Sequence, residues 1–202
     1  MIRPDPFNLI VSGIGGQGNI LLSRIVGRLM FKAGYYVNIG ETFGAAQRGG
    51  SVFSAVRISK KRIYGPIVPD GHANAIISLE ALEALRVLSR YGNPKVAAVV
   101  NTEPIYPVAV LSRRAEYPGE DDIRRAVSKA SGRAFFFNAT RMALDLGAPI
   151  VVNIVMLGGL VGVGLLPLEA SLVEEEIKTS VPGSKTELNL TAFRKGISAV
   201  AV

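Results

Sequence analysis

The sequence predicts an α/β fold in which a mixed, mainly parallel sheet lies between two layers of helices. Short apolar runs alternate with amphipathic stretches along the 202 residues, and a glycine-rich turn of the Rossmann type follows the first run. One extended segment, residues 51–63, has no crossover helix before it, which indicates an antiparallel strand. The length fits a single domain over residues 1–202.

The first half of the chain predicts three strands and one helix. Residues 7–11 are an apolar run, and residues 19–33 have helical periodicity. The apolar positions of this helix are Ile20, Leu21, Ile25, Leu29 and Met30. Residues 35–39 and 51–59 predict two more strands, and apolar positions alternate along the second.

The second half continues the alternation of strand and helix. The predicted strands are residues 75–79, 95–100 and 134–137, and the predicted helices are residues 80–90, 121–130, 168–179 and 187–200. Leu188, Phe193 and Ile197 should point inward from the last helix. Residues 150–166 are almost wholly apolar, but Asn153 interrupts the run. We therefore predict a core helix that packs closely through its glycines rather than a membrane span.

Composition excludes several classes of function. The chain has no cysteine, so it cannot form disulfides, thiolate zinc sites or iron–sulfur clusters by itself. A net charge of +7 favours anionic partners, but the basic pairs lack interleaved aromatic residues, so no nucleic-acid partner is expected. Residues 1–8 do not resemble a signal peptide. We expect a cytoplasmic protein with no membrane partner.

The glycine-rich turn is the first candidate site. Its proposed binding residues are Gly13, Gly15, Gly16, Gln17 and Gly18, which match the spacing G-x-G-x-x-G. The turn should connect the first strand to the first helix, whose N–H groups and positive dipole end attract phosphate or carboxylate groups. The alternative is a tight turn that binds no ligand and packs against another subunit.

A second polar, glycine-bracketed loop should lie at the same end of the sheet. Its proposed binding residues are Glu41, Gln47, Arg48, Gly49, Gly50 and Ser51. Arg48 can bind a carboxylate or phosphate with two hydrogen bonds, and Glu41 lies near the position of a ribose-binding acid. The alternatives are an ordinary surface loop and, for Glu41, a charge in water.

Two further sets of polar residues favour structural roles. Glu80, Glu83 and Arg86 are three residues apart, which is typical of a ladder of ion pairs on one helix face more often than of a partner contact. His72, the only histidine, follows Asp70 in a Pro-Asp-Gly-His segment. This segment is typical of a turn rather than of an acid–base pair.

Several motifs in order resemble the gamma-type module of the 2-oxoacid:ferredoxin oxidoreductases, especially its indolepyruvate branch. The matching segments are residues 13–18, 41–51, 56–58, 79–86 and 100–102, Pro104 or Pro107, residues 117–118, Asn153 with residues 157–158, Asn189, residues 192–193 and Gly196. The resemblance covers essentially the whole chain. One departure is Ala73-Asn74, where the family usually has an aspartate before the buried strand.

The resemblance implies a non-cluster subunit of an enzyme that converts an aryl 2-oxo acid, CoA and oxidised ferredoxin into an acyl-CoA, carbon dioxide and reduced ferredoxin. It implies that a larger alpha subunit holds thiamine diphosphate, magnesium and [4Fe-4S] clusters. The present chain has neither cysteine nor the Gly-Asp-Gly segment that holds thiamine diphosphate. No catalytic residue and no metal ligand is assigned to this chain alone, and CoA is the expected co-substrate.

Three alternatives stay open at this point. Within the family, the substrate can be pyruvate or 2-oxoglutarate instead of indolepyruvate. Outside it, the glycine turn is compatible with a freestanding oxidoreductase that binds NAD(P) or flavin. The chain can also be an interaction module without enzymatic activity, in which case Gln47 and Arg48 would matter to no partner activity.

Overall fold

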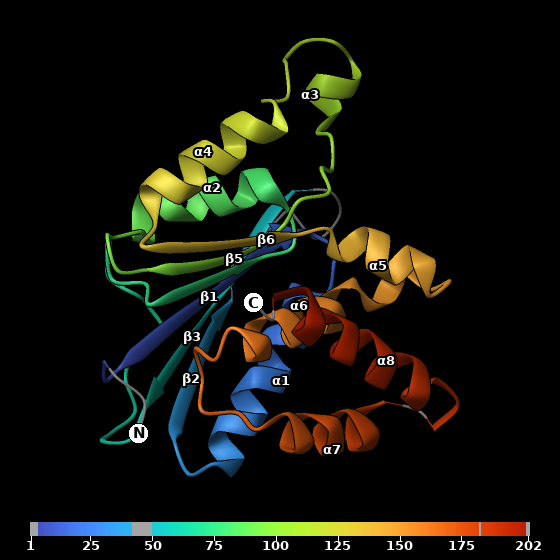
Figure 1. Cartoon of the computed structure of the whole chain (residues 1–202). Helices are drawn as coiled ribbons and strands as arrows, with labels where there is room; N and C mark the ends of the chain where they lie inside the picture. The colour runs from blue at the N-terminus through green and yellow to red at the C-terminus, as the bar shows by residue number, and fades with distance from the viewer. Residues whose placement is uncertain (1–3, 42–49, 182, 201–202) are drawn as a thin grey trace.

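The computed structural model describes residues 4–41, 50–181 and 183–200, and it contains one six-stranded sheet (Figure 1). The strands are β1 (Phe7–Ile14), β2 (Tyr36–Glu41), β3 (Ser51–Ser59), β4 (Ala75–Ser78), β5 (Ala97–Asn101) and β6 (Arg133–Phe137). Their order across the sheet is β2-β3-β1-β4-β5-β6. Only β3 among them runs against the others, so the predicted mixed, mainly parallel sheet is confirmed.

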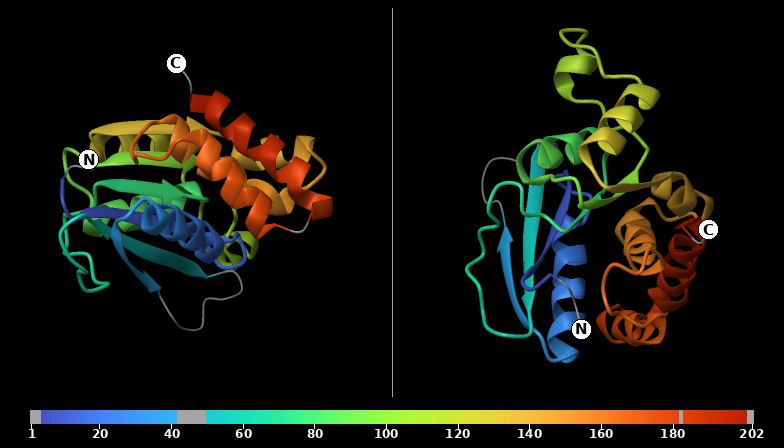
Figure 2. Two further views of the ribbon diagram at one scale, coloured as in Figure 1. Left: turned by 90° about the horizontal axis from the view of Figure 1, so that it is seen from below. Right: turned by 60° about the vertical axis from the view of Figure 1, so that its left-hand side comes forward.

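Helices cover both faces of the sheet. They are α1 (Asn19–Lys32), α2 (Ala81–Tyr91), α3 (Val108–Leu111), α4 (Glu120–Ala130), α5 (Ala139–Asp145), the 3-10 helix η1 (Pro149–Val151), α6 (Val152–Gly162), α7 (Ala170–Ser180) and α8 (Gly183–Val200). Figures 1 and 2 show α2 and α4 on one face, and α1 with the helices from α5 onward on the other. The predicted three-layer arrangement is confirmed.

Alternate residues of the central strand supply two separate hydrophobic cores. Leu9 and Val11 of β1 belong to the core on the side of α1, whereas Ile10 belongs to the core on the side of α2. Successive side chains of a strand point to opposite faces, so a strand covered on both faces is apolar throughout. This explains why residues 7–11 are a continuous apolar run.

Two expectations about β1 and α1 were wrong. The strand continues past Val11 to Ile14, because Ser12 and Gly13 pair with β3. In α1 the buried stripe begins at Leu22, whereas Ile20 and Leu21 are each 47% exposed. Both side chains lie on the side of the helix away from the stripe that Leu22 begins, although Asn19 in the same turn is buried.

Helices α3 and α5 were not predicted. They have four and seven residues, which is too short for hydrophobic periodicity to reveal. The predicted ends of the other elements shift by a few residues. The largest shift is in α8, which begins at Gly183 instead of residue 187.

The predicted core helix is confirmed, and it packs against α8 through glycines. A Cβ atom on Gly158 would lie 2.1 Å from the carbonyl oxygen of Phe193, and one on Gly196 would lie 1.9 Å from that of Val155. The two backbones therefore touch without side chains between them. Within the described ranges, no helix is both long enough and apolar enough to cross a bilayer.

We expect Gly196→Ala to lower the free energy of unfolding by about 3 kcal/mol or more, because the added methyl group must push α6 and α8 apart. Urea denaturation checks this. Gly183→Ala is the matched control, since no atom lies within 4 Å of its Cβ position on the same helix. Equal stability of the two variants would contradict the close packing.

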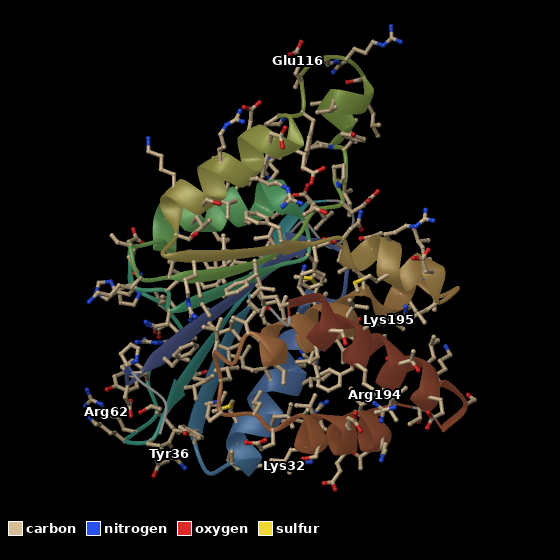
Figure 3. The ribbon with its side chains drawn as sticks, viewed as in Figure 1. Lys32, Tyr36, Arg62, Glu116, Arg194 and Lys195 are labelled. Atoms are coloured by element: carbon tan, nitrogen blue, oxygen red, sulfur yellow. The ribbon has the colours of Figure 1, made fainter. Side chains whose placement is uncertain are left out.

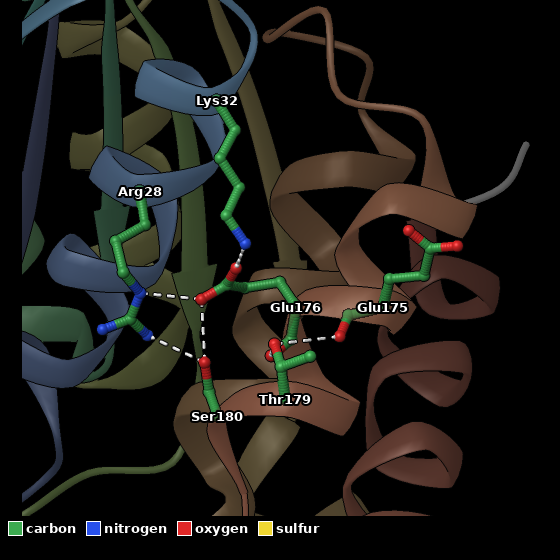
Figure 4. A network of polar contacts seen from close by, with 6 residues as sticks. All are labelled: Arg28, Lys32, Glu175, Glu176, Thr179 and Ser180. Carbon is green, nitrogen blue, oxygen red and sulfur yellow. Dashed lines mark hydrogen bonds and ion pairs between the residues drawn. The ribbon is translucent and has the colours of Figure 1, made fainter.

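A buried carboxylate joins α1 to α7 on the outer side of the helical layer. Glu176 accepts hydrogen bonds from Arg28 at 2.7 Å, Lys32 at 2.6 Å and the Ser180 hydroxyl at 2.7 Å (Figure 4). Burial raises the pKa of Glu176, but the bonds from Lys32, Ser180 and Arg28 outweigh burial and lower it to about 2.

A lowered pKa in the folded state means that Glu176 stabilises the protein at neutral pH and that this contribution is lost as the pH falls. We expect Glu176→Gln to lower the free energy of unfolding at pH 7 by about 2 kcal/mol. The difference from the wild type should shrink below about pH 4.5 and vanish near pH 2. Denaturation curves between pH 2 and pH 7 measure it, and a difference independent of pH would contradict the charged network.

Candidate functional site

The candidate site lies at the edge of the sheet where the parallel strands end. The helix after β1 packs on one face and the helix after β4 on the other, although β1 and β4 are neighbours in the sheet. The two connections therefore diverge and leave a crevice between the strand ends. Open α/β sheets bind ligands at such a point.

The glycine turn forms one wall of this crevice. Gly16 has a φ of 104° and Gly18 a φ of 88°, which only glycine adopts readily. Gly18 is the N-cap of α1, and no side chain caps the helix there. The first N–H groups of α1, with the positive end of the helix dipole, therefore face the space in front of the turn.

The side chain of Gln17 is used within the protein. Its Oε1 accepts a hydrogen bond from the backbone N–H of Ile14 at 2.7 Å, and its Nε2 donates to the carbonyl of Leu79 at 2.8 Å. The amide lies directly over Gly13, where an added Cβ would be 2.7 Å from Oε1. Gln17 thus bridges the crevice between β1 and β4.

This arrangement argues against binding of a dinucleotide. In that fold the backbone at the second glycine of the fingerprint approaches the pyrophosphate. Here the corresponding N–H of Gly15 donates to the carbonyl of Gly50 at 2.9 Å, and the Gln17 amide occupies the space over Gly13. Both positions are taken by the protein's own groups.

The second loop ends beside the glycine turn. Gln47, Arg48 and Gly49 lie outside the described residues, so their predicted roles stay predictions. Gly50 contacts the turn through Gly15, and the hydroxyl of Ser51 donates to Glu83. The two predicted loops therefore do meet at one edge of the sheet.

Glu41, at the start of the second loop, is paired with a cation of the neighbouring helix. Its Oε1 lies 3.4 Å from the Nε of Arg24, and its side chain is largely buried. The carboxylate thus faces α1. This placement does not fit a charge in water, and the predicted ligand contact of Glu41 stays a prediction.

Glu80 and Glu83 are buried at the same edge, with exposed fractions of 1% and 2%. Glu80 is the N-cap of α2, where its side chain accepts a 2.9 Å hydrogen bond from the N–H of Glu83, and it also accepts one from the Tyr117 hydroxyl. Glu83 accepts bonds from Ser51 and from Arg86. Of the predicted ladder, the Glu83–Arg86 ion pair forms, whereas Glu80 caps the helix instead.

The contacts of Glu83 and Tyr117 shift the pKa values of both side chains. Burial raises the pKa of Glu83, although the Ser51 hydroxyl and the Arg86 guanidinium oppose it. Burial also raises the pKa of Tyr117, and the hydrogen bond to Glu80 adds to the effect. Tyr117 is therefore a neutral donor at physiological pH.

The sequence signal for the Glu80 cap of α2 is an acid at residue 80 with a second acid three positions later.

A cleft of about 1070 Å³ opens in front of the glycine turn. Asn153 of α6 also lines it, and a Cβ atom added at Gly18 would lie 2.5 Å from the Nδ2 of Asn153. Further lining residues are Gly16, Gln17, Leu21, Ile25, Glu103, Ile105, Thr140, Ile150, Lys185, Leu188 and Asn189. The walls are mainly apolar, and the N-terminal end of α1 supplies polar N–H groups. Sequence reasoning did not place Thr140, Glu103 or Lys185 here, since they come from distant segments.

The remaining titratable groups of the described residues form no metal centre. Among residues 4–41, 50–181 and 183–200, no three His, Asp or Glu side chains gather closely enough to hold an ion. The ring of His72 lies 2.7 Å from the carbonyl oxygen of Asp70 in an exposed turn. The predicted turn role of His72 is confirmed.

The fold and this edge define a doubly wound α/β protein with a ligand-sized cleft beside a glycine turn. Residues 8–199 match the family model described as pyruvate ferredoxin/flavodoxin oxidoreductase, and the chain belongs to this family. This confirms the predicted family and the prediction that the chain is one subunit of an oxidoreductase.

Named relatives place the chain more closely. It is 37% identical to indolepyruvate oxidoreductase subunit IorB of Pyrococcus horikoshii, over 96% of this chain and 95% of that protein. It is 30% identical to 2-oxoglutarate synthase subunit KorC of Methanothermobacter marburgensis, over 92% of each. The crystal structure of pyruvate oxidoreductase subunit PORC of Thermotoga maritima matches with a TM-score of 0.71, 20% identity and 96% coverage of both chains. This last match supports the fold.

The bridge formed by Gln17 yields a prediction that separates a structural role from ligand binding. Gln17→Ala should lower the free energy of unfolding by about 2 kcal/mol, because it leaves the N–H of Ile14 without its partner. Gln17→Glu should also be less stable than the wild type, since a carboxylate still accepts from Ile14 but sets an oxygen that cannot donate against the carbonyl oxygen of Leu79. Urea denaturation of both variants measures this. Unchanged stability together with lost activity of the assembled enzyme would assign Gln17 to a ligand instead.

Proposed function

We propose that this chain is the non-cluster subunit of a CoA-acylating 2-oxoacid:ferredoxin oxidoreductase whose substrate is indolepyruvate or another aryl pyruvate. The observation that supports this most directly is the cleft of about 1070 Å³ at the carboxyl edge, where an uncapped helix faces mainly apolar walls. The whole-length similarity to IorB adds the substrate class, since its identity of 37% exceeds the 30% to KorC.

The chemistry of the bond cleavage belongs to a larger alpha subunit under this proposal. Thiamine diphosphate, magnesium and [4Fe-4S] clusters supply carbon–carbon cleavage and electron transfer, with ferredoxin as the acceptor. The present chain does not fit these groups, because it has no cysteine and its described residues form no metal-binding cluster. The complex is expected in the cytoplasm.

This chain would contribute binding and exclusion of water. The N–H groups at the start of α1, beside Gly16 and Gly18, are suited to a phosphate group of CoA. Leu21 and Leu188 in the cleft would contact the apolar part of the same molecule. Lys185 lies at the cleft with an exposed side chain, so its charge would attract the phosphates.

The assembly itself is tested by purifying the tagged chain from its native host under argon. We expect a brown complex with a larger, cysteine-rich protein that reduces ferredoxin only with CoA and a 2-oxo acid present. Indolepyruvate should have a higher kcat/KM than pyruvate and 2-oxoglutarate. A colourless lone chain whose Tm rises with NAD(P) would overturn the proposal.

Lys185 gives a sharper prediction within that complex. Lys185→Glu should raise the KM for CoA about fivefold, because reversing an exposed charge near a phosphate changes the interaction by about 1 kcal/mol. The KM for indolepyruvate should not change. Lys195→Glu is the matched control, because Lys195 is exposed on the same helix but does not line the cleft (Figure 3). Equal effects of the two substitutions would place CoA elsewhere.

A further inference from the structure

A segment between β5 and α4 projects from the body of the protein. We call residues 102–119, which include α3, the arm. Figures 1 and 2 show it extending beyond α4 and away from the sheet, and Figure 3 shows Glu116 at its outer end. Val108 and Leu111 of α3 are 80% and 69% exposed. Large apolar side chains that protrude in this way are typical of a binding surface.

The base of the arm is fixed to the candidate site. The rings of Tyr106 and Tyr117, one on each side of the arm, pack edge to face with centroids 5.2 Å apart. Tyr117 donates its hydroxyl hydrogen to Glu80, and the N–H of Thr102 donates to the carbonyl of Phe137 at 3.1 Å. These contacts hold both sides of the arm together near the carboxyl edge.

The tip is shaped by its own backbone. The N–H of Arg113 donates to Val110 at 2.9 Å, and that of Arg114 donates to Ala109 at 2.8 Å. This pair of bonds is the Schellman motif, and Arg113 adopts the left-handed conformation that the motif requires, with a φ of 57°. The single turn of α3 is therefore formed before any partner binds, which reduces the entropy lost on association.

The arm continues the apolar surface around the cleft. Ile105, at the base of the arm, lines the cleft together with Leu21 and Ile150. All three side chains are exposed, as are Ile20 and Tyr106 nearby in the sequence. A partner that covers the cleft would therefore meet the arm as part of one surface.

We infer that the arm docks into an apolar groove of the larger subunit, with Val108 and Leu111 as its anchors and acidic side chains at the rim of that groove. This inference rests on the proposed function, which sets the larger subunit against the cleft. In the described part of the chain, neither Arg113 nor Arg114 forms an ion pair. Both follow the anchors directly, so they are available to carboxylates of the partner.

A second copy of this chain fits the arm less well. A two-fold contact centred on α3 would set Arg113 and Arg114 of one copy against the same residues of the other. Like charges at an interface oppose association.

The test uses the larger subunit separated from the complex that is purified from the native host. The wild-type chain and the double variant V108S/L111S are compared for their dissociation constants with the isolated larger subunit. We expect binding to weaken at least about tenfold, because anchor residues dominate interface affinity. The Tm of the isolated variant should equal that of the wild type, since both side chains are exposed. The control I63S/I67S removes two exposed isoleucines from the loop that joins β3 to β4, and it should bind like the wild type.

Each outcome has a distinct meaning. If the wild-type chain binds no larger subunit, the proposed function fails and this inference fails with it. If the wild type binds and V108S/L111S binds equally well, the arm is not the docking element, whereas the proposed function stands. Equal weakening by I63S/I67S would likewise overturn the assignment. A dimer of the isolated chain that V108S/L111S dissociates would assign the arm to a second copy.

Discussion

Two hydrogen bonds of the Gln17 side-chain amide hold together the edge of the sheet on which the rest of the site depends. They connect the backbone of Ile14 to the carbonyl of Leu79 and so fix the turn after β1 against the end of β4. Only a residue without a Cβ leaves room for this amide over position 13. The glycine spacing that predicts a nucleotide site therefore forms a turn closed by the Gln17 side chain. This turn fixes the direction of α1, so that the N-terminal end of the helix faces the cleft.

The residues that follow β4 also connect the glycine turn to β5, to α2 and to Tyr117. The carbonyl of Leu79 also accepts a hydrogen bond from Asn101 at the end of β5, and Glu80 caps α2 while it accepts one from Tyr117. A buried carboxylate is stable only when its oxygens are hydrogen-bonded, and here the helix cap and a neutral phenol satisfy it. The position of the arm thus follows from the same short segment that closes the crevice.

Most of the fold could be predicted from local patterns, and most of the site could not. The continuous apolar runs of β1 and β4, the antiparallel β3 and the glycine contact between α6 and α8 follow from periodicity, covered faces and small residues. By contrast, Ile20 and Leu21 are apolar yet exposed, because they lie on the side of α1 away from the buried stripe of Leu22, Ile25 and Leu29. Burial of Glu80 and the position of Asn153 beside Gly18 depend on segments far apart in sequence, which no local pattern contains.

The closed crevice also explains why exposed apolar side chains gather at this edge. A freestanding doubly wound protein places its ligand between the strand ends and surrounds it with its own loops. Here the chain fills that space itself, so a ligand can reach only the outer side of the turn, where the N–H groups of α1 lie beside Leu21, Ile105 and Ile150. Water would weaken the attraction between such N–H groups and an anion. When a second protein covers the apolar rim, it excludes that water. The cleft is completed only by such a partner, and the projecting arm is a surface to which the partner can bind.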